Sequence, residues 1–131
     1  MKSNLDQFFK SDKKAQAEGV WFTINDQTSF KIRHFDKSNP IMSAAMAKYF
    51  KPFAAQVKLG TLSEDKQQEI FIKIFVEVCL ADWKGVIVDE KELEFSKEAA
   101  MKIMTEYPPL FDALWTFANT FDNYKVIVGE A

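Results

Sequence analysis

The longest apolar stretch of the chain is Ile70–Leu80, where nine of eleven residues are apolar. Its two charged residues, Lys73 and Glu77, lie one helical turn apart and mark the only face that could reach water. A helix that is apolar around most of its circumference must be covered on several sides. With Ser63 as a favourable N-cap, we predict a central helix that runs through this stretch and stops at residues 82–85, where a glycine can end it.

Two segments before this stretch alternate between apolar and polar residues with the period of a β-strand. They cover residues 20–24 and 30–34, and residues 25–29 between them are rich in turn-forming residues. This pattern predicts a β-hairpin. One face of it would carry Val20, Phe22, Ile24, Phe30 and Ile32. An isolated hairpin is only marginally stable, so this face is expected to lie on helices.

The other periodic segments predict helices. Including the central one, helices are expected to start near residues 3, 38–40, 63, 96 and 108–109. The first would extend to residue 17, and Pro52 should kink or divide the second. Residues 86–95 could form a small, irregular hairpin, and the tail from residue 126 is expected to fray. The expected fold is therefore α+β and predominantly α-helical, with about five helices and an N-terminal β-hairpin (residues ~20–35) packed on them, in a single domain spanning residues 1–131.

Composition narrows the class of protein. Hydrophobic residues make up 47% of the chain, which is ordinary for a globular domain. The net charge of −2 and the lack of a long basic cluster argue against binding to nucleic acid. Cys79 is the single cysteine and suits a reducing compartment. No apolar signal segment opens the chain, and the eleven-residue run is too short to span a membrane. We therefore expect a soluble cytoplasmic protein.

Residues that could carry chemistry are few. The four glycines are scattered and cannot form a phosphate-binding loop. Cys79 would need exposure and a cationic neighbour to act as a nucleophile, and its apolar surroundings offer neither. His34 has no partner histidine, so a polar residue at a strand end is favoured over a metal ligand. The acidic residues 89–94 lack the ligand spacing of a calcium loop and indicate a solvated turn. We expect no enzymatic activity, no cofactor and no metal.

Aromatic residues make up 15% of the chain, including thirteen phenylalanines. We expect a domain of this size to leave part of this apolar surface exposed to a partner. The candidate partner-binding residues are Trp83, Phe111 and Trp115, because they exceed what one core face requires. The alternative is that all three are buried in a phenylalanine-rich core.

Several short segments occur in an order that is typical of one family. They are Glu18–Trp21, Phe30–Arg33, Lys51–Pro52, Gly60–Leu62, Ala81–Gly85, Phe95–Ala99 and Pro109–Leu110. Through them, over roughly residues 18–121, the sequence resembles the tail assembly chaperones of long-tailed bacteriophages and prophages.

The resemblance implies a small, mostly helical protein with a β-hairpin and no catalytic site. Such a protein binds the tape measure protein in the host bacterial cytoplasm, keeps it soluble and helps to recruit tail tube subunits. It tends to self-associate, often has a longer frameshifted product and is absent from the finished virion. The alternative is a structural tail or head-completion protein that is retained in the virion. A small regulatory domain is a third possibility, and it lacks a basic recognition helix.

Overall fold

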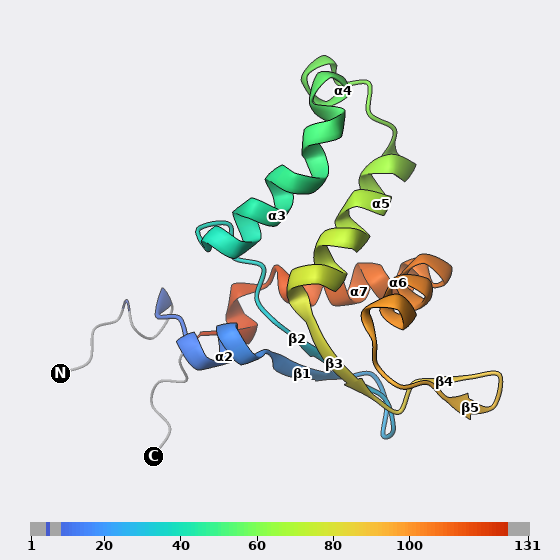
Figure 1. The fold of residues 1–131 in the computed structure, drawn as a ribbon. Coiled ribbons are helices and arrows are strands. Elements are labelled where there is room, and N and C mark those ends of the chain that lie inside the picture. Colours follow the sequence, from blue (N-terminus) through green and yellow to red (C-terminus); the bar gives the residue numbers. More distant parts are fainter. Residues whose placement is uncertain (1–4, 6–8, 126–131) are drawn as a thin grey trace.

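The structure is a computed structural model in which residues 5 and 9–125 are described. At its base lies a three-stranded antiparallel sheet with the order β1–β2–β3 (Figure 1). Strand β1 spans Val20–Thr23, β2 spans Ser29–Ile32 and β3 spans Leu80–Lys84. Most of the other described residues are helical, so the predicted α+β, predominantly helical fold is confirmed.

Strands β1 and β2 form the predicted hairpin, with Val20 opposite Ile32 and Thr23 opposite Ser29. The connecting loop is stabilised by Asn25, whose side-chain oxygen accepts hydrogen bonds from two following backbone N–H groups. The predicted apolar face lies against the helices, because Phe30 and Ile32 are buried. Its outermost member, Ile24, is instead exposed at the end of the hairpin.

The predicted central helix is shorter than expected. Helix α5 spans Glu64–Ile74, one turn of π-helix covers Phe75–Cys79, and the chain then becomes strand β3 at Leu80. In the π-turn the backbone N–H of Leu80 donates to the carbonyl of Phe75, five residues earlier. Ser63 caps the helix start as predicted, and the segment is buried along most of its length. Its central position is confirmed, but the prediction that the helix runs through Leu80 to residues 82–85 is wrong.

Pairing with β2 explains why the helix ends early. Phe30 lies opposite Trp83, and Ile32 lies opposite Leu80. Leu80 and Trp83 are buried while Asp82 is exposed. Residues three apart share the covered side because the pairing register shifts between Lys31 and Ile32, an irregularity of the β-bulge kind. A short apolar run does not reveal by itself whether it is helix or strand. Here the free edge of β2 supplies backbone hydrogen-bond partners that a longer helix would leave unused.

Helices α3 and α5 rise together from the sheet, and α4 joins them at the far end (Figure 1). Helix α3 spans Pro40–Phe50 and is capped by the Asn39 side chain, as the sequence indicates. Pro52 then lies in a 3₁₀ turn, Lys51–Phe53, that leads into α4, Ala54–Leu59. The prediction that Pro52 divides this helix is confirmed.

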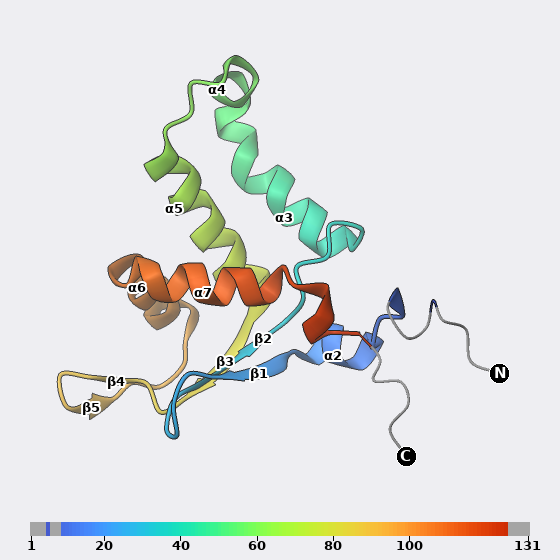
Figure 2. The same ribbon diagram turned by 180° about the vertical axis from the view of Figure 1, so that it is seen from behind.

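The C-terminal half adds a small hairpin and two helices. Strands β4 (Ile87–Val88) and β5 (Lys91–Glu92) pair across a two-residue turn, as predicted. Helix α6 spans Lys97–Glu106 with Ser96 as its N-cap, and α7 spans Pro108–Ala118. Seen from behind, α7 lies across the base of the α3–α5 pair, next to the sheet (Figure 2).

The two ends of the described chain meet beside the sheet. The short helix α2, Lys13–Glu18, covers the last part of the helix predicted over residues 3–17. Residues 10–12 are not helical and interrupt that prediction, and residues 3–4 and 6–8 lie outside the described residues. Tyr124, just after the 3₁₀ turn Phe121–Asn123, is fully buried, and its hydroxyl donates to the Ile32 carbonyl at 2.9 Å. Its own carbonyl accepts from the Asp12 N–H at 2.7 Å. The expectation that the tail from residue 126 frays lies outside the described residues.

Two glycines provide a test of how closely β3 and the hairpin loop fit together. Gly85 and Gly60 have almost the same positive φ, 67° and 69°. A Cβ atom on Gly85 would lie 1.8 Å from the Gln27 carbonyl oxygen, whereas one on Gly60 would meet no atom within 4 Å.

We expect Gly60→Ala to lower the free energy of unfolding by about 1 kcal/mol, the cost of the left-handed conformation alone. Gly85→Ala should lower it by about 3 kcal/mol or more, because the hairpin loop must also move. Urea denaturation of both variants measures the difference. Equal losses would contradict the close approach of Gly85 to the loop.

Candidate protein-binding surface

An open groove of about 410 Å³ lies where the tip of the β1–β2 hairpin, strand β4 and the α6–α7 junction meet. Its lining is mostly apolar and includes Ile24, Phe30, Ile87, Tyr107, Pro109 and Leu110. Ile24, Ile87 and Tyr107 keep 45%, 57% and 48% of their surface exposed. Grouped apolar side chains in a concave, solvent-exposed site are typical of a surface that binds another molecule.

Local structure holds the sides of this groove together. The backbone N–H of Ile24 donates to the Thr28 carbonyl at 2.9 Å, and the Thr28 hydroxyl donates to the Gly85 carbonyl at 2.9 Å. The hairpin tip is thereby attached to the segment that leads into β4. On the other side, Tyr107 leaves the helical conformation, with φ −123° and ψ 72°, because it precedes Pro108, and this turns the chain from α6 into α7.

Sequence reasoning did not find this groove. It assigned Ile24 to the covered face of the hairpin and Tyr107 to the apolar face of the helix before the two prolines. The available signals were weak: Ile24 stands next to a turn, and Tyr107 stands beside Pro108 and Pro109. Neither signal indicates that the two residues lie near each other, because 83 positions of chain separate them.

Trp83, a predicted partner-binding residue, is instead part of the core. It is 5% exposed, and its ring packs edge-on against Phe30 and Phe95. The indole N–H donates to the Leu93 carbonyl at 2.8 Å, which ties the β4–β5 hairpin to β3. Trp83 therefore fits the alternative of a buried core residue, because strand β3, which the sequence did not predict, places its ring against Phe30 and Phe95.

The other two predicted partner-binding residues lie on α7. Phe111 is 1% exposed and contacts the Phe75 ring, so it is also a core residue rather than surplus surface. Trp115 is only partly buried and packs between Phe35 and Phe71, with ring centroids 5.0 and 5.5 Å away. Trp83 and Phe111 are therefore both buried, and neither side chain is open to a partner.

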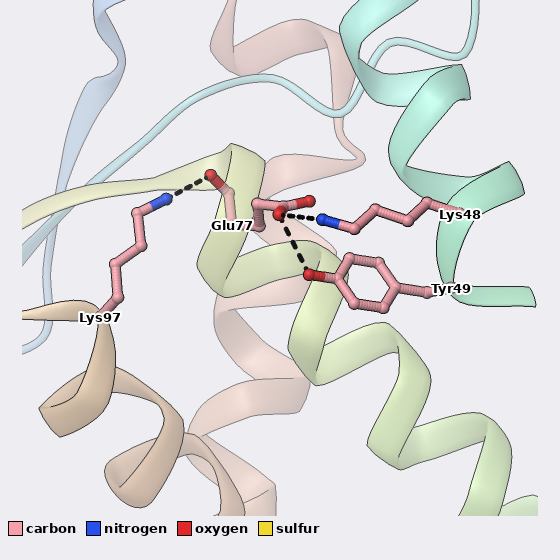
Figure 3. Close-up of polar contacts among 4 residues, drawn as sticks. All are labelled: Lys48, Tyr49, Glu77 and Lys97. Carbon is pink, nitrogen blue, oxygen red and sulfur yellow. Dashed lines mark hydrogen bonds and ion pairs between the residues drawn. The ribbon is translucent and has the colours of Figure 1, made fainter.

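The π-turn presents Glu77 to three partners from two other helices (Figure 3). Its carboxylate accepts hydrogen bonds from the Lys48 ammonium and the Tyr49 hydroxyl, both at 3.0 Å. Its backbone carbonyl accepts from the Lys97 ammonium at 2.7 Å. The Lys48 hydrogen bond, with a smaller contribution from Tyr49, holds the pKa of Glu77 below its usual value. Glu77 therefore stays ionised. Its contacts join α3, the π-turn and α6, which is a structural role and not one in proton transfer.

The other candidate reactive groups are enclosed by the fold. Burial raises the pKa of the Cys79 thiol to about 12, so it is protonated and unreactive at neutral pH. Among the described residues, no cluster of three or more His, Cys, Asp or Glu side chains could hold a metal ion. No helix in the described part of the chain is long and apolar enough to cross a membrane.

His34 lies in a closed environment beside β2. Its ring stacks on Tyr124 with centroids 4.7 Å apart, and its Nδ1 lies 3.0 Å from the Gln16 amide nitrogen. Burial lowers the pKa of His34, and the nearby Asp36 carboxylate only partly opposes this shift. The neutral imidazole therefore accepts the amide hydrogen bond and acts as a packed polar residue at the strand end.

This environment predicts a pH dependence of stability. Because the pKa of His34 is lower in the folded chain than its ordinary 6.5, the unfolded chain binds a proton more readily. The free energy of unfolding should have its full value above pH 6.5 and should decrease as the pH falls toward about 5. Urea midpoints across this range measure the slope. In His34→Gln the slope should disappear, since His34 is the only histidine; an unchanged slope would contradict this account.

Comparison with known proteins places the chain in a family. The family model described as YdaY prophage protein matches residues 37–126. The match includes α3 to α7, β3 and the β4–β5 hairpin, and it begins after the β1–β2 hairpin. No curated protein and no solved structure matches the chain. Because the matched region covers more than half of the sequence, this chain belongs to the YdaY prophage protein family.

Proposed function

We propose that this prophage protein is a tail assembly chaperone that acts in the host bacterial cytoplasm. It binds the tape measure protein, keeps it soluble and helps to recruit tail tube subunits. Three observations support the proposal: membership of a prophage protein family, the ordered segments that resemble tail assembly chaperones, and the open apolar groove. The groove carries the proposal, because it offers an apolar contact surface without reactive groups.

The chemistry of the groove suits a long apolar client. A tape measure protein is an extended helical chain whose apolar stripes stay exposed until the tail tube encloses them. A groove bordered by Ile24, Ile87 and Tyr107 can cover a short piece of such a stripe. One contact of this size is weak, but many copies along one client give strong and reversible coverage.

The titratable groups support a binding function rather than catalysis. Cys79 is buried as a neutral thiol, and Glu77 is held ionised by Lys48. His34 is enclosed between Tyr124 and Gln16. All three groups stabilise the fold and lie outside the lining of the groove. We therefore propose that the protein is not an enzyme and works without a cofactor.

Co-expression with the tape measure protein of the same prophage tests the proposal. The wild-type chain should copurify with it and keep it in the soluble fraction. Ile87→Ser and Tyr107→Ser should each reduce the copurified amount by about tenfold, the effect of removing an apolar anchor. Both side chains are about half exposed, and serine is a favourable N-cap for α7 at position 107, so the fold should persist.

Leu59→Ser is the matched control, because Leu59 is 75% exposed on α4, far from the groove. It should leave copurification unchanged. If the wild-type chain does not associate with the tape measure protein, the proposed function is wrong. If Leu59→Ser weakens association as much as the groove variants do, the groove is not the binding surface.

Purified particles provide a second test. A chaperone is released before the tail is complete, so mass spectrometry of phage particles induced from the host should detect the tail tube and tape measure proteins and not this chain. Detection of this chain at a stoichiometry similar to that of a structural protein would show instead that it is a tail or head-completion component retained in the virion.

A further inference from the structure

The segments that line the groove are strongly acidic. Residues 24–28, 86–92 and 106–112 together carry six carboxylates and one lysine. The carboxylates are Asp26, Asp89, Glu90, Glu92, Glu106 and Asp112, here called the acidic rim, and all six are exposed. These three segments have a net charge of −5, whereas the whole chain has a net charge of −2. The excess negative charge therefore lies on the segments that line the exposed apolar groove.

The fold leaves most of these carboxylates without an ion-pair partner, although Asp112 accepts a hydrogen bond from the Gln68 amide at 3.4 Å. None of the ion pairs found among the described residues includes a carboxylate of the acidic rim. Of the lysines closest in sequence, Lys84 places its ammonium 4.1 Å from the centre of the Trp21 ring. Lys91 and Lys102 border a separate hollow beside the β4–β5 hairpin, where they offset part of the charge of Asp89 and Glu92.

We propose that the groove binds a basic amphipathic helical segment, with apolar side chains one turn apart flanked by lysine or arginine. The inference rests on the proposed function, since it assigns this segment to the tape measure client. Apolar anchors would displace water from Ile24, Ile87 and Tyr107. The acidic rim would attract the flanking cations and repel an acidic helix of the same shape.

The same charge disfavours other classes of partner. Nucleic acid and anionic lipid surfaces present phosphate groups, which the acidic rim would repel. A second copy of this chain is the remaining protein occupant, because α4 carries exposed Val57 and Leu59 next to Lys58. The client segment is preferred because α4 brings only one cation, Lys58, against the six carboxylates on the segments that line the groove.

Two fluorescent helical peptides test the inference on the full chain. They share one apolar stripe of leucines and differ only in flanking residues, lysine in one and glutamate in the other. Fluorescence anisotropy should show that the lysine peptide binds about tenfold more tightly than the glutamate peptide at about 50 mM salt. The difference should shrink at about 500 mM salt, where charges are screened. Equal affinity of the two peptides would overturn the inference.

Charge reversal on the protein provides a matched pair of variants. Glu106 is the last residue of α6 beside the groove, and Glu18 is the last residue of α2 at the opposite end of the sheet (Figure 2). Lysine is favourable at a helix C-terminus, so both variants should fold. Glu106→Lys should weaken the lysine peptide and strengthen the glutamate peptide, each by about threefold or more, and Glu18→Lys should change neither. Equal effects of both variants would show a response to net charge alone and overturn the inference.

The possible outcomes separate this inference from the proposed function. If the tape measure protein copurifies through the groove but the peptides show no charge preference, only the inference fails. If the lysine peptide binds through Glu106 but the tape measure protein does not copurify, the proposed function fails and the client assignment falls with it. If Glu106→Lys and Lys58→Glu each reduce the mass of the free protein in sedimentation, the groove holds a second copy, and the inference is overturned.

Discussion

Strand β2 lies between β1 and β3, and its pairing with β3 joins two parts of the chain that are about fifty residues apart. The pairing places Trp83 opposite Phe30, and both rings enter the core. It also brings Gly85 against the hairpin loop at Gln27, so the chain leaves the sheet beside the hairpin tip. The position of β4, and with it one side of the groove, depends on this contact.

The helices pack around the segment that precedes β3, which consists of α5 and the π-turn. Helix α5 and the π-turn contact α3, α6 and α7. The π-turn converts helix into strand, with the Leu80 N–H bonded to the Phe75 carbonyl and the Glu77 carbonyl bonded to Lys97. Glu77 stands at this conversion point. Its carboxylate holds α3, and its carbonyl receives Lys97 from α6 (Figure 3). A charge within an otherwise apolar run thus serves as a polar junction between helices.

The potentially reactive side chains of this protein are enclosed by the fold, whereas several apolar side chains are exposed to solvent. The Cys79 thiol is buried, and the His34 imidazole and the Glu77 carboxylate are held by hydrogen bonds. The exposed side chains of Ile24, Ile87 and Tyr107 line the groove, and the segments that carry them are rich in exposed carboxylates. The family match covers β4 and the α6–α7 junction but not the hairpin tip, so the groove combines both parts of the chain. This distribution supports the proposal that this YdaY family protein acts by binding a partner.

The sequence alone determined the features that depend on neighbouring residues. Alternation with period two identified the β1–β2 hairpin, and capping residues such as Asn39 and Ser96 located helix starts, because these signals act within one or two turns. Only the tertiary structure decided that the end of the apolar run pairs as β3, that Trp83 and Phe111 are buried, and that Ile24, Ile87 and Tyr107 share one exposed groove. Each of these outcomes depends on which distant segment covers a given apolar face, and no local spacing encodes that choice.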